Sequence, residues 1–147
     1  MHHATHHAAN FAFRSSITFG ATLLFTRLGR YIESNRVKPD DAFYRIRNAL
    51  DRKIKIISPS IELIETLVTR GNSALESITG LTSSIRNDIA DISVLVMRFI
   101  DTKASALDPK AELLRRNEIL EKMNDLLKKI EDVGIVFCNC LRSSLYP

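Results

Sequence analysis

Three points along this 147-residue chain combine a proline with a residue that can cap a helix, and these junctions constrain the fold most strongly. Proline is favoured at the first helical position, and serine or aspartate is favoured just before it. Between the junctions apolar residues recur every three or four positions, and no long stretch alternates with period two. The pattern predicts an all-α protein, a bundle or array of about four to five amphipathic helices. The junctions are Pro39 with Asp40 and Asp41, Ser58 with Pro59, and Asp108 with Pro109.

Start and stop signals place five helices along the chain. Asn10 is the expected N-cap of the first, and Ser73 with Glu76 has the S-x-x-E spacing of a capping box. Gly71 and Gly134 are expected to end helices, because glycine readily adopts the left-handed conformation that follows a helix. The predicted helices cover about residues 11–32, 39–57, 59–70, 73–99 and 109–132.

Composition indicates one ordinary domain, since 45% of the residues are apolar and 26% are charged. We expect a single helical domain over residues 11–134. Residues 1–10 hold all four histidines and are expected to be a disordered tail without a metal site. Residues 135–147 are expected to be an apolar tail, the aberrant end of a truncated reading frame. Cys138 and Cys140 are too few to bind zinc, and we expect both thiols to be reduced.

Positive charge is concentrated at the start of the chain. The formal net charge is +4, and residues 1–38 carry all of it. The remaining residues hold sixteen charges of each sign. A protein that binds nucleic acid through phosphates usually has a basic stripe on its folded body. We therefore expect no nucleic-acid partner.

The apolar stretch at residues 11–32 allows several interpretations. Its longest uncharged run, between Arg14 and Arg27, has only twelve residues, whereas a membrane-spanning helix needs about 20. We predict no transmembrane span, with peripheral membrane contact left open. A secretory signal is one alternative, and a mitochondrial presequence is a stronger one because no acidic residue precedes Glu33. We favour a first helix that packs on the rest of the domain.

Motifs for catalysis are missing from the sequence. It contains no phosphate-binding glycine loop, no zinc-protease motif, no nucleophile elbow, and no histidine after residue 7. Two pairs of carboxylates have i, i+3 spacing, Glu62 with Glu65 and Asp88 with Asp91, but such pairs are usually solvated on helix surfaces. We predict that the protein is not an enzyme and binds no cofactor.

A basic cluster in the second predicted helix is the best candidate for binding a partner. It consists of Arg45, Arg47, Arg52, Lys53 and Lys55. We expect Arg45, Arg52, Lys53 and Lys55 to contact an acidic surface of another protein. The alternative interpretation is an ordinary solvated helix face.

The segment 53–89, KIKIISPSIELIETLVTRGNSALESITGLTSSIRNDI, resembles the N-terminal part of the fungal Ran-binding protein family. That family pairs an IISP-hydrophobic-ELI helix with an RGN-x-x-LES junction and a following L-T-x-x-x-R-x-D-I helix. With the opening stretch FAFRSSITFGATLLFTRLGRYI, the resemblance covers about residues 11–103. The matching positions also read as helix caps and stops, so we expect them to be structural. They are Ser58, Pro59, Arg70, Gly71, Asn72, Leu75, Glu76 and Ser77.

The resemblance implies a function that composition and spacing do not. It implies binding to the GTP form of the small GTPase Ran, modulation of its GTP hydrolysis, and a role in nucleocytoplasmic transport, in the cytoplasm and also the nucleus. Family members are much longer, so we expect this chain to be a fragment, the N-terminal part of a larger domain. The alternative function is a membrane-associated or mitochondrial helical adaptor.

Overall fold

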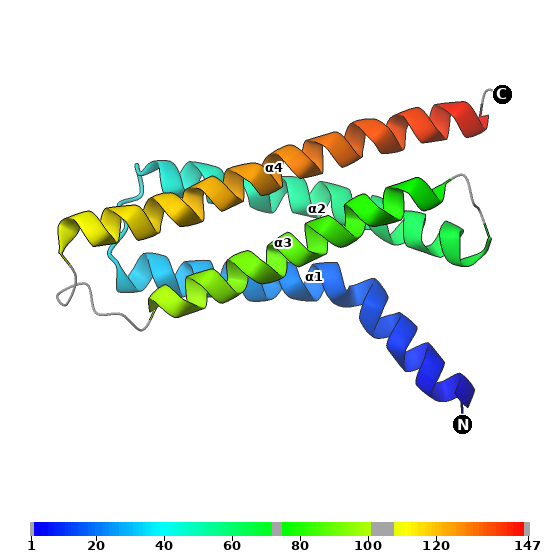
Figure 1. The fold of residues 1–147 in the computed structure, drawn as a ribbon, viewed down its shortest axis with the longest axis horizontal. Helices are drawn as coiled ribbons and strands as arrows, with labels where there is room; N and C mark the ends of the chain where they lie inside the picture. The colour runs from blue at the N-terminus through cyan, green and yellow to red at the C-terminus, as the bar shows by residue number, and fades with distance from the viewer. Residues whose placement is uncertain (1, 72–74, 101–107, 146–147) are drawn as a thin grey trace.

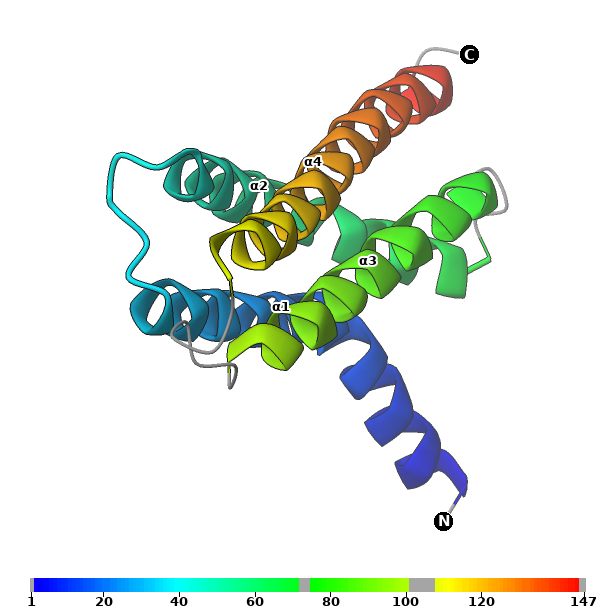
Figure 2. The ribbon, with the colours of Figure 1, turned by 60° about the vertical axis from the view of Figure 1, so that its left-hand side comes forward.

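Four helices form a bundle in the computed structural model, and helices that follow one another in sequence run in opposite directions (Figure 1). The structure describes residues 2–71, 75–100 and 108–145, and their side chains except those of residues 2–16, 77 and 140–145. All described secondary structure is helical, which confirms the predicted all-α bundle. The helices are α1 (His2–Ser34), α2 (Ala42–Thr69), α3 (Glu76–Ile100) and α4 (Pro109–Leu145). Figure 2 shows α3 lying along α1 and α4 lying along α2.

The first helix starts earlier than expected. α1 begins at His2, so residues 2–10 are helical and Asn10 lies inside the helix instead of capping it. No glycine or proline precedes Gly20, and Ala4, Ala8 and Ala9 favour a helix. The N-terminal part of α1 leads away from the bundle, and the rest packs against α3 (Figure 1). The favoured interpretation of residues 11–32, a packed first helix, agrees with the burial of Ile17, Leu24 and Leu28.

The second and third predicted helices are one continuous helix. The N-cap of α2 is Asp41, whose Oδ1 accepts a hydrogen bond from the backbone N–H of Phe43 at 2.9 Å, so Pro39 lies outside the helix. Pro59 lies inside α2, and the prediction of a new helix there is wrong. Ser58 is not a cap, because its Oγ donates to the carbonyl of Ile54 at 2.6 Å.

The apolar stripe of α2 explains why the helix continues through Pro59. Proline cannot donate the hydrogen bond of a helix interior and normally kinks or breaks it. Here the side chain of Pro59 is exposed, while Ile54, Ile57, Ile61 and Ile64 on either side of it are buried. Each buried aliphatic side chain stabilises the fold by roughly 1.5–3 kcal/mol. Burial of the whole stripe therefore outweighs the local break of about 3 kcal/mol.

Gly71 ends α2 as predicted. Its φ of 93° lies in the left-handed region, and its N–H donates to the carbonyl of Val68 at 3.0 Å. Asn72 and Ser73 lie outside the described residues, so the predicted capping box is not tested. After the junction, Leu75 is buried and Glu76 opens α3.

The fourth helix starts as predicted and ends later. Asp108 caps α4, and its Oδ1 accepts from the N–H of Ala111 at 2.8 Å. The prediction that Gly134 ends this helix is wrong, because α4 runs to Leu145 and makes residues 135–145 of the predicted apolar tail helical. Val136 and Phe137 pack against a small core of Ile64, Leu75 and Ile78, which continues the apolar stripe past Gly134.

Two of the carboxylates expected to be solvated hold helices together. Glu65 is buried and forms an ion pair with Arg86, which joins α2 to α3. Asp88 pairs with Lys129 at 2.7 Å and joins α3 to α4. The interpretation as a solvated residue is therefore wrong for Glu65, whereas Asp88 is paired and still 27% exposed. Their partners come from other helices, where sequence spacing does not reveal them.

Candidate functional site

The outer side of α2 carries a stripe of exposed side chains, which we call the α2 crest: Arg45, Arg52, Ile56 and Leu63. Their spacing of seven, four and seven residues places them along one side of a helix. Leu50, Ile54, Ile57 and Ile61 turn the opposite side into the core. Ile56 is 76% exposed and Leu63 is 47% exposed. The crest is therefore basic in its first half and apolar in its second.

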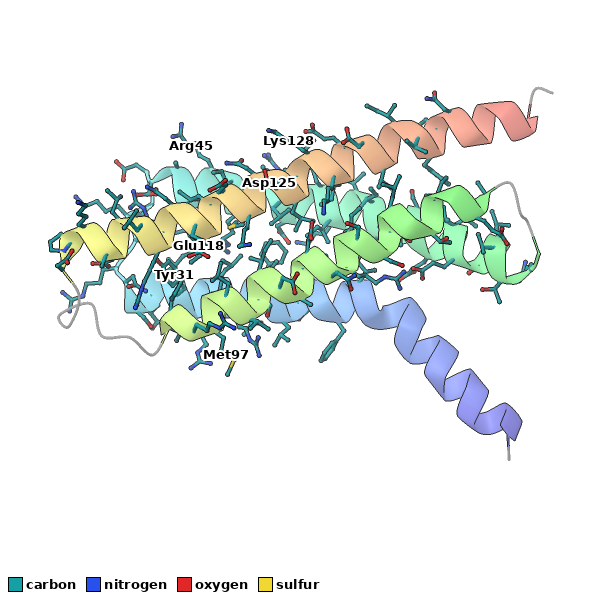
Figure 3. All side chains as sticks on the ribbon, in the orientation of Figure 1. Tyr31, Arg45, Met97, Glu118, Asp125 and Lys128 are labelled. Carbon is teal, nitrogen blue, oxygen red and sulfur yellow. The ribbon has the colours of Figure 1, made fainter. Side chains whose placement is uncertain are left out.

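The predicted basic cluster divides into free and paired cations. Arg45 and Arg52 are exposed and make no ion pair among the described residues, and Figure 3 shows Arg45 pointing away from the bundle. Lys53 Nζ lies 2.6 Å from Glu131 Oε1 of α4, and Lys55 Nζ lies 3.0 Å from Asp51 Oδ2. Exposed pairs of this kind contribute about 0–1 kcal/mol. Contact of the four residues with a partner stays a prediction, and the two arginines are its strongest members.

Arg47, the remaining member of the cluster, is used within α2. Its guanidinium lies over the ring of Tyr44, 5.7 Å from the ring centroid, which is a cation–π distance. The side chain is half-buried. This placement agrees with its omission from the residues expected to contact a partner.

An apolar slot lies between α2 and α4, next to the crest. Its volume is about 320 Å³. The Lys53–Glu131 ion pair joins the two helices at the slot. A Cβ at Gly134 would meet no heavy atom within 4 Å outside its own helix, so the absent side chain leaves this part of the slot open. The slot is lined mainly by Ile56, Ile57, Ile64, Val133, Gly134 and Phe137.

The sequence analysis missed this slot. Gly134 was interpreted as a helix stop, and Ile56 did not belong to the apolar stripe of its helix. The one sequence signal for the slot is Ile56, an isoleucine that lies outside the apolar stripe of its helix. The opposite wall comes from α4, so only the packed bundle reveals a slot.

A larger groove of about 690 Å³ lies between α1 and α2. Phe25 and Ile54 contribute apolar surface, and Thr18, Thr22 and Thr26 line the α1 side. The hydroxyls of Thr22 and Thr26 donate to carbonyls one turn back, at 2.9 and 2.8 Å. These hydroxyls already have acceptors, so the groove offers mostly apolar surface.

A third hollow, at the end of the bundle, surrounds Tyr31. Asp41 and Arg116 pair there at 2.7 Å, and the ring of Tyr31 stacks on that of Phe43 with centroids 5.5 Å apart. Burial, followed by the negative charge of Glu112, raises the pKa of the Tyr31 phenol above its usual value of 10. The phenol thus stays neutral at physiological pH. These contacts join α1, α2 and α4 and fit a structural role.

The family-motif residues lie where helices end or bend. Ser58 and Pro59 lie at the interrupted turn of α2, and Arg70 with Gly71 ends that helix. Leu75 is a buried core residue. The side chain of Ser77, like all of Asn72, lies outside the described part of the structure. Gly71 acts as the predicted helix stop, but Ser58 and Pro59 do not start a helix, so a structural role for the whole motif stays a prediction.

The described residues contain neither a metal-binding cluster nor a membrane-spanning helix. Within them, no group of three His, Cys, Asp or Glu residues could hold a metal ion. No helix in that part of the chain is long and apolar enough to cross a membrane. Cys138 is an exposed free thiol beside the slot.

Comparison with known proteins adds to this geometry. A family model described as RanGTP-binding protein matches residues 1–139. The match extends the predicted resemblance over residues 11–103 at both ends, and it includes residues 1–10 and the first residues of the predicted tail. No solved structure gives a significant match.

Two proteins of Schizosaccharomyces pombe match most of the chain. An uncharacterized protein is 28% identical over 109 residues, which is 74% of this chain and 23% of the relative. A RanBD1 domain-containing protein is 30% identical over 110 residues, which is 75% of this chain and 19% of the relative. The chain thus spans about a fifth of the length of these curated relatives.

Proposed function

This chain belongs to the RanGTP-binding protein family, and from that premise we propose that it is a non-enzymatic binding module for the GTP form of the small GTPase Ran. Its role would be to hold one conformation of the nucleotide-bound GTPase and so change the rate of GTP hydrolysis. A ligand shifts a conformational equilibrium only through its different affinity for the two states. Selectivity for the GTP form is therefore the property that the proposal requires.

The family match over residues 1–139 carries the proposal. The surface of the bundle supports it, because the α2 crest combines two free arginines with exposed apolar side chains. Arginine is enriched at protein interfaces, and the buried centre of an interface is more apolar than the rest of the protein surface. Positive side chains at the edge of an interface also speed association with an acidic partner. The process served would be nucleocytoplasmic transport, with the protein in the cytoplasm and nucleus.

Capture of purified Ran tests the proposal. Ran would be loaded in parallel with a non-hydrolysable GTP analogue and with GDP, and offered to the immobilised 147-residue chain. We expect the GTP-analogue form to bind at least about tenfold more tightly, a difference of about 1.4 kcal/mol. Equal capture of both forms, or no capture by a chain that circular dichroism shows to be helical, would contradict the proposal.

Charge reversal tests the role of the crest. Combining Arg45→Glu with Arg52→Glu should slow association with the GTP form roughly threefold or more at low salt, because the attraction becomes a repulsion. Arg30→Glu with Lys110→Glu is the matched control, since both residues are exposed and lie on other helices. Stopped-flow association at two salt concentrations is the measurement. Equal slowing by the two double variants would assign the effect to net charge and not to the crest.

A second candidate function, a membrane-associated or mitochondrial adaptor, is favoured by α1. The N-terminal part of this helix leads away from the bundle, and no acidic residue precedes Glu33 (Figure 1). A presequence cleaved on import would remove a tag fused to the N-terminus and keep one at the C-terminus. Retention of both tags on a cytoplasmic protein would contradict this second function.

A further inference from the structure

The slot between α2 and α4 has the size and surroundings of a site for a single apolar side chain. Its volume of about 320 Å³ lies at the low end of the range for ligand sites, about 300–1,000 Å³. Ile57, Ile64 and Val133 form buried walls, and Ile56 stands exposed at its edge. The recess is therefore mainly apolar, and its polar lining residues are Ser60, Cys138 and the Lys53–Glu131 ion pair.

Ile56 connects the slot to the arginines of the crest. It lines the slot and lies one turn after Arg52, on the same side of α2 as Arg45. Within the slot the one pair of charges, Lys53 and Glu131, neutralises itself. The crest itself is therefore positively charged through Arg45 and Arg52, which favours an acidic partner.

The groove between α1 and α2 differs in charge, although it is larger. Its charged residues are the Asp51–Lys55 pair and Glu62, so their sum is negative. An acidic partner would be repelled there and attracted at the crest. The positive charge of the crest therefore favours the smaller α2–α4 slot over the α1–α2 groove as the place where an acidic partner inserts a side chain.

We propose that the α2–α4 slot receives one large apolar side chain from an acidic surface of the GTPase, while Arg45 and Arg52 contact the acidic residues around that side chain. This assignment rests on the proposed function, and it adds which surface binds and what chemistry it recognises. A buried apolar anchor with a charged edge is the usual arrangement of a binding hot spot. The anchor sets the dissociation rate, and the charges set the association rate.

A substitution that places a large side chain in the slot tests the assignment, because it would occupy the space proposed for the partner's side chain. Gly134→Phe places a ring where no heavy atom of another element lies within 4 Å of the new Cβ. Gly80→Phe is the matched control, because Gly80 also lies inside a helix and has the same open surroundings, but it lies on α3. We expect Gly134→Phe to weaken binding of Ran loaded with the GTP analogue at least about tenfold, mainly by faster dissociation. Gly80→Phe should leave the affinity within about twofold of the original.

Cys138 supplies a second measurement that needs no change in the slot. In the Cys140→Ser chain, Cys138 is the one thiol, and it lies beside the slot. Bound GTPase should slow its alkylation by a small maleimide at least about fivefold, because the partner covers this surface. This measurement decides the assignment if Gly134→Phe fails to fold.

The possible outcomes separate the two proposals. If the original chain captures neither form of Ran, the proposed function and the slot assignment both fail. If it captures the GTP form, but Gly134→Phe binds equally well and Cys138 stays reactive in the complex, the slot assignment fails and the proposed function stands. Loss of affinity in Gly134→Phe alone, with protection of Cys138, supports both.

Discussion

Two of the contacts between neighbouring helices, which we call seams, each contain a glycine. The two glycines differ in how much space surrounds them. In the seam between α1 and α3, a Cβ built on Gly20 would lie 3.4 Å from Cγ2 of Ile89. In the seam between α2 and α4, a Cβ built on Gly134 would meet nothing within 4 Å. A side chain at the first glycine would meet the facing helix at van der Waals distance, whereas the second glycine lies beside a slot. The α1–α3 seam is therefore packed at Gly20, whereas the α2–α4 seam has open space at Gly134, the place where we propose that a partner binds.

The largest expected effect is a loss of packing in the closed seam. Leu24 lies one turn after Gly20 and is fully buried. Leu24→Ala should lower the free energy of unfolding by about 2–5 kcal/mol, because it removes buried methyl groups and leaves a cavity. Urea denaturation followed by circular dichroism is the measurement.

Leu114→Ala is the control for that change, since Leu114 is 63% exposed on α4. It should change the free energy of unfolding by no more than about 0.5 kcal/mol. Equal losses for the two variants would show that the α1–α3 seam has no special place in stability.

The next largest effect on stability is expected when a larger side chain is added within the closed α1–α3 seam. Gly20→Val should lower the free energy of unfolding by about 1–3 kcal/mol, because the added methyl groups approach Ile89 more closely than the helices allow. Combining it with Ile89→Ala should cost less than the sum of the two single changes, since the smaller side chain makes room for the valine. A double variant that is no better than the sum of the two single changes would contradict close packing at this point.

Filling the open seam with a single methyl group should have the opposite sign. Gly134→Ala should raise the free energy of unfolding by up to about 1 kcal/mol, because alanine favours a helix interior and the new methyl group meets no obstacle. Gly80→Ala should behave alike, since its surroundings are also open. Thermal denaturation of both variants tests this expectation. A lower melting temperature for Gly134→Ala alone would show that the slot is closed in solution.

The smallest expected effect concerns the ion pair that joins the helices of the open seam. Lys53→Met should change the free energy of unfolding by less than about 1 kcal/mol, because the side chains of Lys53 and Glu131 are 40% and 53% exposed. Denaturation at low and high salt is the measurement. A loss of several kcal/mol in the free energy of unfolding would contradict this expectation. The ion pair would then stabilise the fold as much as a buried apolar side chain does.

Local signals in the sequence predicted much of the fold. The cap at Asp108 and the stop at Gly71 are backbone signals that act within a few residues, and both occur as predicted. The signals at Pro59 and Gly134 are of the same kind, and the structure overrides both. In each case an apolar stripe continues across the signal and packs on another helix. Burial of apolar side chains between helices therefore outweighs the local signals at Pro59 and Gly134. Sequence spacing alone does not show how much surface is buried.

The candidate site was less predictable than the fold. The basic residues of α2 could be found from sequence, but the pairing of Lys53 with Glu131 depends on how α4 lies against α2. The slot depends on Gly134 facing Ile56 and Ile57 from another helix. The sequence predicted the charged half of the surface, and the packed bundle was needed to find the apolar half.

Amide hydrogen exchange of this chain, with and without Ran loaded with the GTP analogue, tests the difference between the seams most directly. Binding at the open seam should slow exchange along α2 and in α4 around Gly134, and should leave the α1–α3 seam around Gly20 unchanged. GDP-loaded Ran should produce much less protection. Protection centred on α1 and α3, with α2 and α4 unchanged, would contradict the account.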